Sequence, residues 1–337
     1  MKIDIILDAG MPAAQVEDLG KLADKYGIQT LWGSCFASRR DPMLTMSGLT
    51  RSTNHVRLGT MPVSPYEVHP QRIADTLLTF NEASNGRASI LIGGLGHSTT
   101  RVTGLQPVRR IDAVRDCVSI LKGISPNAPL NYTGEVYQLT DYCPEWATAA
   151  PPLIYVGATG PRMLRMSAAV SDGTMMSDVP LSRMAEVIGH IEHGLNDAGR
   201  DRSEFRVNNF FAWHIKKDRA ASMAEARQGL VWRGLLQAWH IATFLDEDEC
   251  AIVEANRPAF LNAFLKKSDR IEGVPEHIVD ALVENLTFAG DENSLDKTIE
   301  HLREFEQAGL DEVALKVHED PANGIRMIAE RLLPKLQ

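Results

Sequence analysis

The sequence has 337 residues, of which 44% are hydrophobic, so the chain can bury the core of one large barrel or of two smaller domains. Its 35 basic and 44 acidic side chains give a formal net charge of −9, which argues against a surface for binding nucleic acids or other polyanions. A small molecule is therefore the expected binding partner.

The N-terminal residues 1–8 predict a strand and not a secretion signal, because Asp4 and Asp8 interrupt the apolar run. No apolar run approaches the roughly 18 residues needed to cross a bilayer, so we expect no membrane association and a cytoplasmic location. The 4 cysteines are scattered without a C-x-x-C pair, which suits a reducing compartment and predicts no metal site.

Short apolar or β-branched runs alternate with longer amphipathic stretches along the chain, the pattern of βαβ units around a parallel sheet. About eight such pairs predict one continuous (β/α)8 TIM barrel in the α/β class, without an internal repeat or a linker. Helical patterns include 13–26 and 111–121. The predicted strands are 3–8, 30–33, 56–61, 88–93, 153–157, 173–176, 205–215 and 312–317.

Two stretches exceed the few residues of an ordinary barrel connection. The first, 97–152, contains a helix that begins near Arg109 and a polar segment, 131–139, that suits a small hairpin. The second, 228–287, is rich in Trp, Leu and Phe and predicts helices inserted into the single domain 1–337. The insertion would close over an active site or form a subunit contact, and the alternative is that its aromatic residues are ordinary core.

The strongest local signal is an apolar strand, 153–157, that runs into a turn of small residues and then into a helix. Glycines allow close approach of the backbone, proline suits the first helical turn, and the unpaired N–H groups of a helix start attract an anion. Arginine adds a charge-assisted contact. The segment predicts a phosphate site, with an ordinary strand-to-helix turn as the alternative; its residues are Gly157, Ala158, Thr159, Gly160, Pro161 and Arg162.

This turn, with the segments 163–168 and 171–173, resembles the phosphate-binding segment of methylenetetrahydromethanopterin-reductase-like enzymes, which are bacterial-luciferase-like flavin and deazaflavin oxidoreductases. The resemblance implies a barrel oxidoreductase that uses coenzyme F420, a deazaflavin, or alternatively FMN. Further matches in the family's order are Val-Arg-Leu-Gly at 56–59, Ser-Pro-Tyr at 64–66, His-Pro at 69–70, Asn-Gly-Arg at 85–87, Ile-Leu-Ile-Gly-Gly at 90–94, Tyr-Thr-Gly-Glu at 132–135 and Ala-Gly-Leu-Asp-Glu-Val at 308–313.

The resemblance also implies a cis peptide at the end of the third strand, where a bulge supports the flavin ring from behind. The flanking matches place that bond between Met61 and Pro62. Because the second residue is proline, a cis bond costs only about 0.5–1 kcal/mol. We predict that the Met61–Pro62 bond is cis and that both residues contact the cofactor.

After the fourth strand, Gly93 and Gly94 lead to His97, at the face of the predicted barrel where barrel enzymes hold their reacting groups. We predict that both glycines contact the cofactor. His97 is the candidate general acid, because imidazole titrates near neutral pH, and the alternative is a histidine that caps a helix or faces solvent. His69, followed by Pro70, is predicted chiefly to orient a helix start.

The chain departs from the deazaflavin members of the family after the second strand, where those enzymes often carry an Asp-His pair. Here Trp32-Gly33 is followed by Ser34 and Cys35, which are the other candidate catalytic residues. Ser34 is a candidate to hydrogen-bond the ring, and Cys35 is alternatively an inert apolar residue. Trp32 either stacks near the ring of the cofactor or fills the top of the barrel.

The leading hypothesis is F420-dependent hydride transfer to or from a small organic substrate. The alternatives are an FMN-dependent monooxygenase, a non-catalytic flavin-binding barrel, and an unrelated phosphate-handling barrel, for which no Glu or Lys is well placed. His190 and His193 lack the H-E-x-x-H spacing, and the acidic segments 246–249 and 291–292 suit helix starts or loops. Because relatives are commonly dimers, we expect a homodimer.

Overall fold

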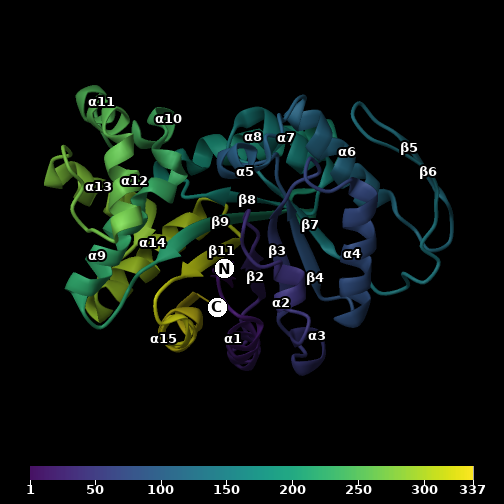
Figure 1. Cartoon of the computed structure of the whole chain (residues 1–337), viewed down its shortest axis with the longest axis horizontal. Helices are drawn as coiled ribbons and strands as arrows, with labels where there is room; N and C mark the ends of the chain where they lie inside the picture. The colour runs from purple at the N-terminus through teal and green to yellow at the C-terminus, as the bar shows by residue number, and fades with distance from the viewer. Residues whose placement is uncertain (337) are drawn as a thin grey trace. The chain divides into compact units, whose positions relative to one another are not determined.

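The structure is a computed structural model that describes residues 1–336, apart from the side chains of His97, Ser98 and Leu235. Eight parallel strands of its main sheet correspond one to one to the predicted strands (Figure 1). These strands are β1 (Lys2–Leu7), β2 (Thr30–Ser34), β3 (Arg57–Val63), β4 (Ala88–Ile92), β7 (Leu153–Gly157), β8 (Gly173–Ser177), β9 (Arg206–Trp213) and β11 (Glu312–Val317).

The strands pair in the order β9-β11-β1-β2-β3-β4-β7-β8, and a further pairing of β9 with β8 closes the sheet. A short additional strand, β10 (Thr287–Phe288), pairs with the end of β9. A closed ring of parallel strands joined by helices is the (β/α)8 TIM barrel, so the predicted fold class is confirmed.

Amphipathic helices connect the strands, and each buries one face. In α1, for example, Val16, Leu19 and Ala23 recur at helical spacing and are buried. Among the described residues, no helix is long and apolar enough to cross a membrane. The connecting helices are α1 (Ala13–Lys25), α2 (Pro42–Thr45), α3 (Leu49–Ser52), α4 (Pro70–Ala83), α5 (His97–Thr103), α6 (Arg110–Gly123), α7 (Pro161–Val170), α8 (Met184–Asp197) and α14 (Leu295–Gln307). Two further helices, α15 (Pro321–Met327) and α16 (Leu333–Leu336), follow the last strand.

The chain groups into two compact units. The first unit comprises Ile3–Met175 and Gly189–Asn208. The second unit comprises Met1–Lys2, Met176–Ile188 and the chain from Asn209 onward. We describe the two units separately.

Trp32 fills the interior of the first unit. The side chain is 0% exposed, its Nε1 donates to Asp4 Oδ2 at 2.9 Å, and its ring meets Tyr155 edge-on at 5.5 Å. Gly59 permits this packing, because a Cβ there would lie 2.3 Å from the indole ring. The structure thus favours the interpretation of Trp32 as barrel filling over a stacking partner for a cofactor.

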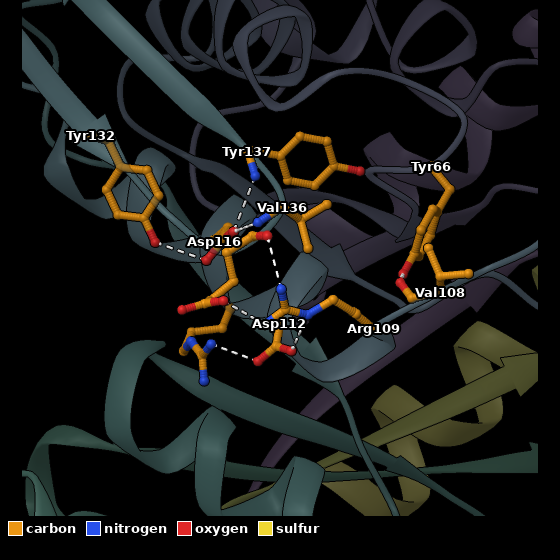
Figure 2. Close-up of polar contacts among 10 residues, drawn as sticks. Tyr66, Val108, Arg109, Asp112, Asp116, Tyr132, Val136 and Tyr137 are labelled. Carbon is orange, nitrogen blue, oxygen red and sulfur yellow. Dashed lines mark hydrogen bonds and ion pairs between the residues drawn. The ribbon is translucent and has the colours of Figure 1, made fainter.

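The predicted hairpin is present as β5 (Leu130–Thr133) paired antiparallel with β6 (Gln138–Tyr142). Figure 2 shows how Asp116 of α6 anchors this hairpin. The buried carboxylate of Asp116 accepts hydrogen bonds from the Tyr132 hydroxyl at 3.0 Å and from the Val136 amide at 2.7 Å. The hairpin is therefore held by charge-assisted hydrogen bonds to a buried carboxylate and not by its turn alone.

The 228–287 segment is helical, as predicted, and lies in the second unit. Phe260 is buried in the shared core of these helices, whereas Trp232, Trp239 and Phe264 are exposed, so the core interpretation holds for Phe260 and not for the other three. The helices here are α9 (Arg219–Gly229), α10 (Ala238–Ile241), α11 (Glu247–Ala255), α12 (Arg257–Lys266) and α13 (Glu276–Leu286).

Candidate active site

A backbone platform forms at the end of β3. The Met61–Pro62 peptide is cis, as predicted, and the pairing of β3 with β4 shifts register beside it. Cys35 N donates to Met61 O at 2.6 Å, and Gly93 N donates to Val63 O at 2.8 Å. A Cβ on Gly93 would lie 3.0 Å from the Pro62 Cβ, so glycine is what lets the two strands approach here.

The two residues of the cis bond differ in accessibility. Pro62 is exposed, so its ring offers a surface to a ligand. Met61 is only 7% exposed and supports the platform mainly from within. Contact of either residue with a cofactor stays a prediction.

Ser34 and Cys35 lie at the end of β2. The buried Ser34 hydroxyl donates to Leu7 O at 2.8 Å, which leaves it as an acceptor toward a further partner. Burial raises the pKa of the half-buried Cys35 thiol to about 11, and the carboxylates of Glu67 and Asp41 add to the shift. This environment disfavours a thiolate and favours the interpretation of Cys35 as an inert residue.

We expect Cys35 to resist alkylation at neutral pH. Because its pKa is raised from 9.0 to about 11, its thiolate fraction at pH 7 is about a hundredfold below that of an unperturbed cysteine. Iodoacetamide labelling followed by peptide mass spectrometry should show a rate at Cys35 that is still rising between pH 10 and 11, with glutathione as the reference thiol. Rapid labelling of Cys35 at pH 7 would contradict the raised pKa.

The loop after β4 begins with two glycines. A Cβ on Gly94 would lie 2.4 Å from Arg110 Cγ, so this position requires glycine for packing. The backbone of His97 starts α5. The side chain of His97 lies outside the described part of the chain, so its assignment as general acid stays a prediction.

The predicted phosphate turn joins β7 to α7. Gly160 is the N-cap residue, Pro161 is the first helical residue, and no side chain caps the helix. No atom lies within 4 Å of the position that a Gly160 Cβ would occupy. The N-terminus of α7 is therefore uncapped by a side chain and sterically open at Gly160, and an uncapped helix start is a feature that an anion site needs.

The other residues of the turn are placed consistently with this site. Gly157 ends β7, and the amide of the buried Ala158 donates to Met175 O at 3.3 Å, which holds the turn against β8. Thr159 is half-buried, and Arg162 is exposed on the first turn of α7. The predicted residues therefore run without a break from the end of β7 through the turn to the start of α7.

The remaining histidines of the sequence analysis lie on helices or at a helix start. His69 is the N-cap residue of α4, and its Nδ1 accepts from Gln71 N at 3.2 Å, so the predicted role at a helix start is confirmed. His193 on α8 is exposed and lies 3.3 Å from Asp197. Among the described residues, no group of three or more His, Cys, Asp or Glu side chains could hold a metal ion.

The acidic segments act as helix starts, as predicted. Asp246 forms a capping box with Glu249 at the start of α11, and Asp291 caps a short 3-10 helix.

Sequence reasoning missed a polar cluster in the second unit. Glu225 of α9 accepts from His214 Nδ1 at 2.6 Å, from Lys216 Nζ at 2.8 Å and from Glu319 N at 3.1 Å. The His318 ring stacks on His214 with ring centroids 4.5 Å apart. A signal was available, because His214 follows β9 and His318 follows β11, and barrel enzymes place functional groups directly after their strands.

A closed ring of parallel strands, with a helix start after its fifth strand that no side chain caps, defines a (β/α)8 barrel protein. Residues 3–312 match the model of the luciferase-like monooxygenase family, and the chain belongs to that family. It is 26% identical over 341 residues to a 5,10-methylenetetrahydromethanopterin reductase of Archaeoglobus fulgidus, with 100% of both chains covered. The resemblance predicted from the sequence is confirmed, and the protein is an oxidoreductase.

Two solved structures share the fold. The coenzyme F420-dependent tetrahydromethanopterin reductase of Methanopyrus kandleri superposes with a TM-score of 0.81 at 19% identity, over 100% of this chain and 99% of that one. An F420-dependent secondary alcohol dehydrogenase in complex with an F420-acetone adduct superposes with a TM-score of 0.75 at 16% identity, over 100% of this chain and 99% of that one. At these identities the similarity supports the fold alone.

Proposed function

We propose that the protein binds coenzyme F420 and catalyses hydride transfer to or from a small organic substrate. The observation that carries this proposal is the uncapped N-terminus of α7 at Gly160, which presents amide donors and open space where a cofactor phosphate would bind. The full-length similarity to a methylenetetrahydromethanopterin reductase favours the deazaflavin over FMN.

The residues of the first unit fit a phosphate-bearing cofactor with a flat ring. The backbone from Gly157 to Pro161 and the Arg162 guanidinium would hold the phosphate. The exposed Pro62, supported from behind by Gly93, would form one wall for the ring. When bound, the deazaflavin would supply the hydride chemistry, and the protein would supply position and a proton.

Among the candidate proton donors, His97 remains the preferred one. The Ser34 hydroxyl already donates to Leu7 O. The Cys35 thiol, with its pKa raised to about 11, is too weak an acid to deliver a proton efficiently near neutral pH. A group that titrates near pH 7 is better matched to this task, and imidazole is such a group.

Cofactor titration tests the proposal. We expect coenzyme F420 to quench the intrinsic tryptophan fluorescence with an affinity at least about tenfold higher than FMN, and a deazaflavin without the phosphate to bind more weakly than F420. A preference for FMN would instead support an FMN-dependent monooxygenase, the activity for which the family is named. Failure of both cofactors to bind would contradict the assignment of the phosphate turn.

A further inference from the structure

The loop that follows β3 is held by a side chain of the hairpin β5–β6. The Tyr137 hydroxyl donates to Pro65 O at 2.7 Å, and the Tyr137 ring meets the His69 ring edge-on, with the ring centroids 5.5 Å apart. Pro65 is buried, and His69 is the N-cap residue of α4. One side chain of the hairpin therefore contacts both ends of the segment 65–69.

A second contact ties the same loop to the segment that precedes α6. The Tyr66 hydroxyl donates to Val108 O. The next residue, Arg109, reaches the hairpin, where its Nη1 donates to Glu135 O at 3.2 Å and its Nη2 pairs with the Glu135 carboxylate (Figure 2). The loop after β3, the segment before α6 and the hairpin are thus joined in a closed ring of hydrogen bonds.

The hairpin is a firm support for Tyr137, because the backbone of Tyr137 is itself bound to α6. The Tyr137 amide donates to the buried Asp116 carboxylate at 3.1 Å, next to the Val136 amide at 2.7 Å. A Cβ on Gly134 would lie 2.4 Å from this carboxylate, so glycine lets the turn of the hairpin approach α6. The Tyr137 side chain therefore starts from a fixed base.

The Tyr137 hydroxyl remains a donor at every physiological pH. Burial raises the pKa of Tyr137 to about 12, and the neighbouring Tyr66, Cys117 and Asp116 add to the shift. Burial also raises the pKa of Tyr66. Both phenols therefore keep the proton that a hydrogen bond to a carbonyl oxygen requires.

The tethered loop is continuous with the backbone platform at the end of β3. Pro62 of the platform and Pro65 of the loop are separated only by Val63 and Ser64. Val63 O accepts from Gly93 N at 2.8 Å, so this stretch is bound to the loop after β4 at one end and to the hairpin at the other. A displacement of Pro65 would therefore change the position of Pro62.

We propose that Tyr137 is a positioning residue for the cofactor. Its hydroxyl fixes Pro65 and thereby Pro62, the wall against which the deazaflavin ring would lie. This inference rests on the proposed function, because Pro62 is such a wall only if a cofactor ring binds there. Every residue in the argument belongs to the first unit.

Hydrogen–deuterium exchange of the full-length protein without cofactor tests the tether itself. Tyr137→Phe removes the hydroxyl and keeps a ring against His69. The amides of Glu67 and Val68 donate to Ser64 O within the loop. We expect these amides to exchange about tenfold faster in the variant, because the loop opens more easily after the loss of one hydrogen bond.

Two further variants separate the tether from a general loosening of the hairpin. The matched control is Tyr132→Phe, which removes a hydroxyl of the same hairpin that donates to Asp116, and it should leave the exchange of the loop unchanged. Tyr66→Phe removes the bond from the loop to Val108 and should speed the exchange, as Tyr137→Phe does. It serves as the second test of the tether should Tyr137→Phe not fold.

Cofactor titration tests the consequence for the ring. Tyr137→Phe should weaken the binding of coenzyme F420 and of a deazaflavin without the phosphate by the same factor, about three- to tenfold, because the ring and not the phosphate loses support. At saturation, the absorption band of the bound deazaflavin should differ between Tyr137→Phe and the wild type. The band should be the same in Tyr132→Phe and the wild type.

Three results would overturn the proposal. In the first, Tyr137→Phe leaves the amide exchange of the loop unchanged. In the second, Tyr132→Phe has an effect as large as that of Tyr137→Phe. In the third, the exchange becomes faster, but the affinity for the deazaflavin and its absorption band stay the same. Absence of deazaflavin binding to the wild type would instead be a failure of the proposed function, and the exchange measurement would still decide whether Tyr137 fixes the loop.

Discussion

Replacement of Gly160 by aspartate is expected to weaken binding of the phosphate-bearing cofactor about 100-fold. The carboxylate would cap the N-terminus of α7, take the amide donors meant for the phosphate, and place a negative charge beside it. Two like charges about 4 Å apart near a protein surface repel by up to about 4 kcal/mol, which is enough for this loss of affinity. Fluorescence titration of the wild type and variant measures the effect.

The matched control is Gly160→Asn, which caps the helix equally well without a charge. Both substitutions should fold, because the backbone of Gly160 has φ −87 and ψ 151 and no atom lies within 4 Å of the added Cβ. We expect Asn to weaken binding by clearly less than Asp. Equal affinities for wild type and Gly160→Asp would show that the phosphate does not bind at α7.

Replacement of Arg233 by methionine is expected to lower the free energy of unfolding by about 3–5 kcal/mol, because it leaves a buried carboxylate without its countercharge. Arg233 is 3% exposed and lies 3.0 Å from Asp178, which is 0% exposed. The guanidinium also lies over the Phe210 ring, 4.9 Å from its centroid. Urea denaturation measures the loss of stability.

The control is the double variant Asp178→Asn/Arg233→Met, which removes both charges. Asparagine tolerates the left-handed backbone of Asp178, whose φ is 54°, and can still accept the hydrogen bond from Gly234 N. We expect the double variant to recover most of the stability lost in the single one. A single variant that is as stable as the double one would show that the charge of Asp178 is balanced by other groups.

Local pattern was sufficient for much of this protein. The alternation of apolar runs with amphipathic stretches predicted the position of every barrel strand. This was possible because the apolar composition of a run indicates a buried strand, and the helical spacing of apolar residues indicates a connecting helix. The Met61–Pro62 cis bond could be predicted because the family resemblance gave its position and because position 62 is a proline. The candidate phosphate turn could be proposed because its glycines, proline and arginine are contiguous in the chain.

The residues whose surroundings could not be predicted share a different property. Trp32 donates a hydrogen bond to Asp4 and packs against Tyr155, and both partners belong to other strands. No feature of the neighbouring sequence predicts that Trp32 is buried by these contacts. His214 follows the end of β9, and His318 follows the end of β11. The two residues are neighbours only because these strands pair. Arg233 contacts Asp178 across 55 positions of the chain.

The sequence by itself therefore determined the barrel, the order of its elements and the turn proposed to hold a phosphate, since each depends on residues close together in the chain. Only the tertiary structure decided which side chains fill the interior of the first unit and which hydroxyl of the hairpin holds the loop after β3. The physical reason is that strand order and register bring distant residues together, and local hydrophobic patterns do not encode which distant partners a buried polar group will have.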